Sequence, residues 1–332
     1  KSAPENRAPG RLKRLQSGHN TDTMILRTAG KRPAEIRSLH MQRQFDIITD
    51  SCCGMPREFY EEHGITEIPL GYTLDGVSYG GGEGKALPLK EFYARLRAGA
   101  ECHTFQVTAE QVRPVIESSF RAGRDVLAVV FSSALSGTAS SFSVAASSLV
   151  EEYPERRALV LDSMGGSMGE GLLVGYLLQR ADGGASLDET YAYGETLKRH
   201  IQHLFTVEDL EFLKRGGRIS PAVAVVGKLL KIKPLLHATP KGTLGPIAKI
   251  VGRKRSLEAL ADDAVRRAEL SDTDPVFIAH GDCEEDAKRM EALLRERFGK
   301  NRRILINYMD PVMGAHGGPG ILAVFFKGKL RE

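Results

Sequence analysis

Long hydrophobic runs are missing from this sequence. The apolar run Ile321 to Phe326 (ILAVFF) is among the longest, whereas a helix that crosses a bilayer needs roughly 18 or more such residues. A secretory signal peptide is not recognisable either. These absences argue against a membrane-spanning protein and predict a cytoplasmic location.

Cysteine is scarce, and the arrangement of the four cysteines excludes common metal sites. Cys52, Cys53, Cys102 and Cys283 form neither a CxxC pair nor a zinc-type cluster with histidine. The adjacent pair Cys52 and Cys53 is geometrically unsuited to a mutual disulfide. We therefore expect no structural metal and four reduced thiols.

A complete phosphate-binding loop is also absent. The glycine-rich stretch Gly80–Lys85 resembles one, but Tyr79 stands in place of the first glycine. Ala86 stands where a serine or threonine hydroxyl would hold magnesium, and no clear apolar strand leads into the stretch. The sequence therefore disfavours a nucleotide-binding kinase domain.

The basic charge is confined to one end of the chain. Residues 1–44 carry ten Lys and Arg against three Asp and Glu, which is +7, and the remaining 36 basic and 39 acidic residues give −3. The globular part is thus mildly acidic, so nucleic-acid binding has little support. We expect residues 1–44 to be a disordered basic leader, with Met41 as a possible start of the folded unit.

Strand-like and helix-like segments alternate through the first half of the chain. A buried-type strand is an apolar run, whereas a helix shows apolar residues at a spacing of three to four. The expected strands are residues 45–51, 65–72, 125–131 and 157–162, and the expected helices are residues 56–63, 89–96, 109–122 and 138–151. Asp75-Gly76 predicts a small hairpin insertion near residues 72–80.

In the second half of the chain, the expected strands and helices no longer alternate regularly. A helix is expected from about residue 167, a twisted hairpin at 232–250 around Lys241-Gly242, and strands at 205–207, 275–280, 304–309 and 321–327. We predict an α/β protein with a Rossmann-like parallel-sheet domain at 45–162 and an α+β domain at 163–332.

Hydroxyl groups follow the predicted parallel strands, at the edge where ligands bind in open α/β sheets. Ser136 and Gly137 lie where the apolar strand at 125–131 gives way to a helix. Their backbone N–H groups and the Ser136 hydroxyl could bind an anionic oxygen. A simple helix N-cap is the alternative, and it is a frequent role of serine.

Three further residues have features of a binding site. Thr104 lies in a hydroxyl-rich link between two predicted helices, and Arg218 follows two glycines that allow a close backbone approach. His316 belongs to the Gly- and Pro-rich segment Gly314–Gly320 (GAHGGPG), which we expect to be a tightly shaped loop. A loop of this kind can present an imidazole at a cleft, although a solvent-exposed turn histidine is the alternative.

Taken together and in this order, seven landmarks closely resemble the DegV family of fatty-acid-binding proteins, from about Phe45 to the C-terminus. They are Asp50-Ser51, Thr104, Leu135–Thr138, Asp162-Ser163, the segment from Phe205 through Leu213–Ile219, Ile232–Pro234 and His316–Gly320. The best understood members are carrier subunits of bacterial fatty acid kinase. The resemblance implies a non-enzymatic carrier without a cofactor. Such a carrier buries a long-chain fatty acid between its two domains and offers the carboxylate to a separate ATP-dependent kinase. The acyl phosphate product would serve phospholipid synthesis, and transient membrane contact is compatible with this role.

The resemblance also assigns roles to residues of this sequence. Thr104 and Ser136, with Gly137, would bind the carboxylate, while Arg218 and His316 would line the same polar mouth. His316 would assist presentation or phosphoryl transfer.

Less specific features of the resemblance concern docking and pocket shape. Arg253 or Arg255 would contribute to kinase docking. Phe105 and Val107 depart from the usual family pattern of serine after the threonine and proline after the glutamine. Because of these two residues, the resemblance does not determine the shape of the pocket.

An enzyme is the alternative reading. A lipid esterase or acyltransferase could use Ser136 as nucleophile and His316 as base. The nucleophile elbow GxSxG is absent, however, because Ala134 replaces its first glycine.

Overall fold

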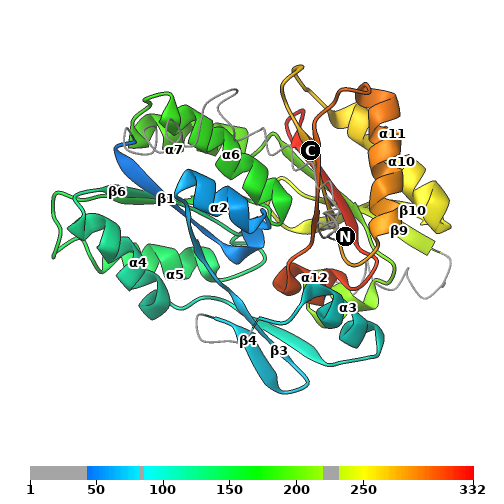
Figure 1. Ribbon diagram of the computed structural model, residues 1–332, viewed down its shortest axis with the longest axis horizontal. Helices are drawn as coiled ribbons and strands as arrows, with labels where there is room; N and C mark the ends of the chain where they lie inside the picture. Colours follow the sequence, from blue (N-terminus) through cyan, green and yellow to red (C-terminus); the bar gives the residue numbers. More distant parts are fainter. Residues whose placement is uncertain (1–42, 82–85, 220–231) are drawn as a thin grey trace, which may run out of the picture.

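The computed structural model describes residues 43–81, 86–219 and 232–332. Nearly all of the expected leader at 1–44 and most of the glycine-rich stretch at 80–85 lie outside these residues. Within them, the chain forms two larger sheets with helices around them and a small third sheet beside the junction (Figure 1). The predicted α/β class is confirmed.

The first sheet has four parallel strands in the order β2-β1-β6-β7. Alternate residues of β6 face opposite sides, because successive side chains of a strand alternate. Val126 and Ala128 pack in the cluster that contains α4 and α5, and Leu127 and Val129 pack in the cluster that contains α6 and α7. Helices therefore cover both faces (Figure 1). The bounds are β1 Phe45–Asp50, β2 Thr66–Ile68, β6 Asp125–Val130, β7 Ala158–Asp162, η1 Ser51–Cys53, α2 Arg57–His63, α4 Ala109–Arg121, α5 Thr138–Ser147, α6 Met168–Asp182 and α7 Leu187–Leu197.

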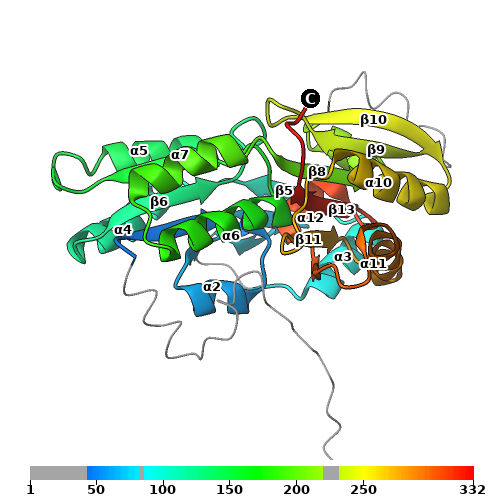
Figure 2. The same ribbon diagram turned by 90° about the horizontal axis from the view of Figure 1, so that it is seen from above.

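The second sheet has six strands in the order β10-β9-β8-β13-β11-β12. Its pairs are antiparallel except β11 with β12. Helices α10 and α11 cover one face, and the predicted hairpin around Lys241-Gly242 is confirmed as β9 and β10 (Figure 2). The bounds are β8 Ile201–Thr206, β9 Ile232–Ala238, β10 Leu244–Val251, β11 Val276–His280, β12 Ile304–Tyr308, β13 Leu322–Lys327, α10 Arg253–Arg267 and α11 Glu284–Phe298.

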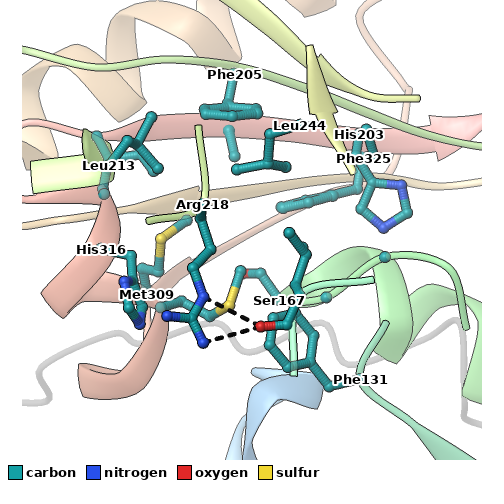
Figure 3. Close-up of a pocket in the computed structure, with 18 residues that line it drawn as sticks. Phe131, Ser167, His203, Phe205, Leu213, Arg218, Leu244, Met309, His316 and Phe325 are labelled. Atoms are coloured by element: carbon teal, nitrogen blue, oxygen red, sulfur yellow. Dashed lines mark hydrogen bonds between the residues drawn. The ribbon is translucent and has the colours of Figure 1, made fainter. Parts of the chain in front are cut away.

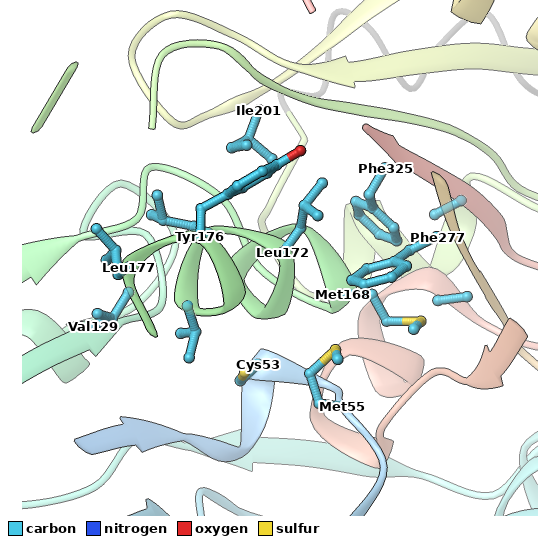
Figure 4. Packing of buried hydrophobic residues seen from close by; sticks show 14 of the residues in the cluster. Cys53, Met55, Val129, Met168, Leu172, Tyr176, Leu177, Ile201, Phe277 and Phe325 are labelled. Atoms are coloured by element: carbon cyan, nitrogen blue, oxygen red, sulfur yellow. The ribbon is translucent and has the colours of Figure 1, made fainter. Parts of the chain in front are cut away.

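Helix α6 joins the two sheets. Twelve of its fifteen residues are buried, which is the pattern of a helix that contacts protein on all sides. Leu172 and Met168 pack with Val129 of the first sheet and with Phe277 and Phe325 of the second in one cluster (Figure 4). The expected boundary at residue 162 stays a prediction, and α6 and α7, which follow it, contact the parallel sheet.

The small sheet β4-β3-β5 and three short helices complete the region beside the junction. Asp75 and Gly76 have φ values of 49° and 79°, as the predicted two-residue hairpin turn requires. The bounds are β3 Gly71–Leu74, β4 Val77–Gly80, β5 Cys102–Phe105, α3 Leu89–Arg97, α8 Glu211–Arg215 and α12 Pro311–Gly317.

Three sequence expectations about local structure are wrong. The single strand expected at 65–72 is two strands in different sheets, and the break falls at Pro69, which lacks an N–H for a ladder. The link that contains Thr104 is strand β5. Gly314–Gly317 is helical rather than a loop, because Asp310 caps the Met313 N–H and Pro311 starts α12.

Candidate functional site

A largely apolar cavity lies between the carboxyl ends of the parallel strands and the six-stranded sheet. Its volume is about 650 Å³, including its opening to solvent. Figure 3 shows His316 and His203 on opposite sides of it. We call this the apolar cavity. Most of its lining is apolar and includes Phe131, Leu135, Phe205, Leu213, Leu244, Met309, Met313, Ile321 and Phe325.

A second space, which we call the mouth, adjoins the apolar cavity and shares Phe131, Arg218 and His316 with it. It has a volume of about 600 Å³. Thr104 and Ser136 also line it. The structure thus brings together the four side chains that the sequence analysis identified in distant segments of the chain. They lie where the lining of the cavity changes from apolar to polar.

Thr104 and His316 contact each other directly. Thr104 Oγ1 lies 2.8 Å from His316 Nε2, and His316 Nδ1 is buried without a hydrogen-bond partner among the described residues. Burial, together with the positive charge of Arg218, lowers the pKa of His316 to about 4. The imidazole is therefore neutral near pH 7.

Arg218 is held by main-chain carbonyls rather than by a carboxylate. Its Nε and Nη2 donate to Leu135 O at 3.1 and 3.0 Å, and its Nη1 donates to Gly216 O at 2.6 Å. A guanidinium has five N–H groups, so two remain for a ligand. Gly217, with φ of 68°, makes the turn that returns Arg218 to the mouth.

Ser136 lies at the start of α5. Its Oγ is 2.9 Å from Thr138 Oγ1 and accepts from Thr138 N at 3.3 Å. No hydrogen bond joins Ser136 to His316 in the part of the chain that the structure describes, so the nucleophile–base pair of a hydrolase is not formed. Gly137 permits the close approach of Gln106, since a Cβ at Gly137 would lie 2.1 Å from Gln106 Oε1.

A third space, the outer polar cavity, borders the Thr104 and His316 pair from another side. It has a volume of about 730 Å³. Arg215 lines it with its guanidinium 4.6 Å above the Phe212 ring. Arg218 and His316 line all three spaces, so these two residues border both the mouth and the outer polar cavity.

The two arginines assigned to docking differ in their surroundings. Arg253 Nε donates to Asp286 Oδ2 at 2.7 Å, and its Nη2 donates to Gly320 O at 2.7 Å. It thereby holds the segment that follows His316. Arg255 is exposed. Their role in docking stays a prediction.

Asp50, at the end of β1, is a carboxylate that holds the neighbouring loops by hydrogen bonds. Asp50 is fully buried and accepts from Cys52 N and Phe131 N, both at 2.8 Å, while burial raises its pKa to about 6.

Among the described residues, no group of three or more His, Cys, Asp or Glu side chains is placed to hold a metal ion. All four cysteines are free, as predicted.

Sequence reasoning missed Gln106, Ser167 and His203. His203 and Phe205 share one face of β8 and both line the apolar cavity. Their alternation is a period-two signal that could have been recognised had the strand been extended upstream of residue 205.

In the described part of the chain, no helix is both long and apolar enough to cross a membrane.

Comparisons with known proteins agree with the fold. The DegV family profile matches residues 44–329. A DegV domain-containing protein of Clostridium perfringens is 38% identical over 290 residues, which cover 87% of this chain and 99% of that protein. A DegV family protein from Thermus thermophilus, solved as a fatty-acid-binding protein, is 27% identical with a TM-score of 0.77, over 86% of this chain and 100% of the other. A Thermotoga maritima protein, whose structure revealed a fatty acid binding function, is 26% identical with a TM-score of 0.74. The match covers 86% of this chain and 100% of that protein.

Proposed function

Because this chain belongs to the DegV family, we propose that it binds a long-chain fatty acid in the apolar cavity. The carboxylate lies at the mouth, and the acyl chain extends past Phe205 and Leu244. The observation that carries this proposal is the continuity of the apolar cavity with a polar mouth that shares its Arg218 and His316.

The cavity favours the acyl chain because burial removes it from water. Each buried CH₂ contributes about 0.8 kcal/mol, so fourteen methylenes contribute about 11 kcal/mol before ordering costs are subtracted. Affinity thus comes mainly from the chain. The mouth supplies orientation, since a buried carboxylate without donors is costly.

A carboxylate only accepts hydrogen bonds, and this requirement orients the Thr104 and His316 pair. If His316 Nε2 carries the proton and donates to Thr104 Oγ1, the Thr104 hydroxyl is free to donate to the carboxylate. Two remaining N–H groups of Arg218 and the Ser136 hydroxyl add further donors. The neutral imidazole then acts as a positioning group for Thr104.

We further propose that the protein presents this carboxylate to a separate ATP-dependent kinase, which forms the acyl phosphate. The outer polar cavity supports this step because it reaches the same Thr104 and His316 pair without passing through the apolar cavity. Arg255 is exposed and would take part in docking.

Two assays test the proposal separately. Displacement of a fluorescent fatty acid by hexadecanoic acid measures binding, and we expect saturation at one ligand per chain. Addition of a fatty acid kinase and ATP measures presentation, and we expect acyl phosphate only when both proteins are present. Binding without any acyl phosphate formation would contradict the presenting role alone, whereas failure to bind any long-chain acid would contradict the carrier function.

A further inference from the structure

Two polar side chains line the apolar cavity and are not among the residues that line the mouth. They are Ser167 and His203, which are 1% and 6% exposed. Ser167 Oγ and His203 Nε2 are buried, and neither has a hydrogen-bond partner among the described residues. Buried polar atoms are normally paired, so each exception calls for an explanation.

The hydrogen-bonding character of His203 follows from its other nitrogen. His203 Nδ1 lies 3.1 Å from Ile201 O, and a carbonyl can only accept, so Nδ1 carries the proton. Burial, with a smaller contribution from the positive charge of Arg331, lowers the pKa of His203 to about 3. The ring is therefore neutral, and Nε2 is an acceptor that needs a donor.

The ring of His203 is held close to the start of α6. A Cβ at Gly165 would lie 2.0 Å from Nε2, and a Cβ at Gly169 would lie 2.2 Å from it. These glycines let the imidazole approach the backbone on either side of Ser167 in the chain. Phe325 packs edge-on against the same ring, with centroids 5.4 Å apart.

Ser167 has an unusual backbone for a residue with a side chain. Its φ is 54° and its ψ is −155°, a region that is strained for residues other than glycine. Serine before a helix usually caps it, but here the side chain makes no cap hydrogen bond. Strain and a forgone cap together mark Ser167 as a residue placed for another contact.

We propose that Ser167 and His203 form a distal polar site for a fatty acid that carries a hydroxyl group in the half of its chain remote from the carboxylate. This inference rests on the proposed function. A hydroxyl can donate to His203 Nε2 and accept from Ser167 Oγ, whereas an unsubstituted chain pairs neither atom. A carboxylate only accepts, so His203 also disfavours a reversed orientation of the ligand.

Competition binding to the full chain tests this site with defined acids. Hexadecanoic acid is compared with its ω-hydroxy and α-hydroxy counterparts, and octadecanoic acid with its counterpart hydroxylated at the twelfth carbon. We expect at least one of the two distal hydroxy acids to bind about five- to tenfold more tightly than its parent, as one well-paired hydrogen bond allows. The α-hydroxy acid should show no such gain.

Two variants assign the preference to the site. His203→Phe keeps an aromatic ring of similar size but removes the acceptor, and Ser167→Ala removes the hydroxyl. Each should reduce the preference for the distal hydroxy acid while hexadecanoic acid still binds. His280→Phe is the control, because His280 is a buried histidine of the same sheet, 3% exposed, that is not among the residues lining the apolar cavity.

The outcomes separate this inference from the function on which it rests. If hexadecanoic acid binds but neither distal hydroxy acid binds more tightly than its parent, the distal polar site is wrong and the carrier function stands. A preference that persists in both the His203→Phe and Ser167→Ala variants would also overturn the site. If no long-chain acid binds at all, both proposals fail.

Discussion

Thr104 and His316 are separated by 212 positions in the chain, yet Thr104 Oγ1 and His316 Nε2 lie 2.8 Å apart. The contact joins strand β5 of the small sheet to helix α12 near the end of the chain. The mouth is therefore complete only when distant parts of the chain have folded together. Both residues are positioned by short elements beside the junction of the two larger sheets.

Replacement of Thr104 by valine is expected to weaken fatty acid binding. The change keeps the β-branched shape but removes the hydroxyl that is proposed to donate to the carboxylate. A hydrogen bond to a charged group contributes about 1.5–3 kcal/mol, so we expect at least a tenfold loss of affinity in displacement titrations. Thr196→Val is the matched control, since Thr196 is an exposed residue of α7. Equal affinities for the Thr104 variant and the parent would contradict the proposed role.

Gly216 is expected to control the position of His316. A Cβ at Gly216 would lie 2.0 Å from His316 Nδ1, although φ of −72° suits alanine. Gly216→Ala should therefore displace the imidazole, break its contact with Thr104 and weaken binding, with little change in circular dichroism. Gly183→Ala has a similar φ of −76° at the C-terminal end of α6 and is not among the residues that line the mouth, so this variant should bind normally. Unchanged binding in the Gly216 variant would show that the ring position is unimportant.

The pH dependence of stability should contain a contribution from His316. Its pKa is about 4 in the folded protein and about 6.5 in an unfolded chain. The unfolded state thus binds more protons between these values, and stability falls as the pH falls from about 6.5 to about 4. Between pH 7 and pH 5, this single group should cost about 2 kcal/mol.

The measurement is urea unfolding of the parent and of His316→Gln at both pH values. Other titrating groups, including the buried Asp50, whose pKa is raised to about 6 and whose effect has the opposite sign, largely cancel in the comparison. The parent should lose more stability than the variant on acidification. Parallel losses in the two proteins would argue against the lowered pKa of His316.

The packing of α6 predicts a large stability effect at Leu172. Leu172 is fully buried between the two larger sheets (Figure 4), and a leucine-to-alanine change in a core costs about 2–5 kcal/mol. Val144→Ala in α5 is the control, since Val144 is 57% exposed and should change stability by less than about 0.5 kcal/mol. Similar unfolding midpoints for the two variants would contradict the central position of α6.

Arg253 and Arg255 should respond differently to substitution. Arg253→Ala removes the hydrogen bond to Gly320 O and the ion pair with Asp286, so it should lower the unfolding midpoint. Arg255→Ala removes an exposed side chain and should leave stability and fatty acid binding unchanged while reducing the rate of acyl phosphate formation by a kinase. Normal kinase turnover with the Arg255 variant would remove this residue from the docking surface.

The sequence predicted the strands with continuous apolar runs, and the signal is strong in β6 because it is buried on both faces. Residues 125–131 and 157–162 correspond to β6 and β7. Strand β5 was missed because its residues CHTF alternate in burial over only four positions. Helix α12 was missed because its glycines disfavour a helix, and tertiary packing beside Tyr93 and Phe92 overrides that preference.

The residues of the site also divide into those that could be predicted from the sequence and those that could not. Thr104, Ser136, Arg218 and His316 could be selected because their ordered motifs resemble a known family, and the structure brings them together at the mouth. Ser167 and His203 could not be recognised by chemistry alone. A serine before a helix normally predicts a cap. Only the structure shows that Ser167 makes no cap hydrogen bond and that His203 Nε2 has no partner among the described residues.

Native mass spectrometry of the purified protein, before and after organic extraction, tests the central claim most directly. The account predicts a mass difference equal to one long-chain carboxylic acid per chain, its removal by extraction, and its return when a long-chain acid is added. A protein that carries no such acid and takes up none when it is supplied would contradict the carrier function.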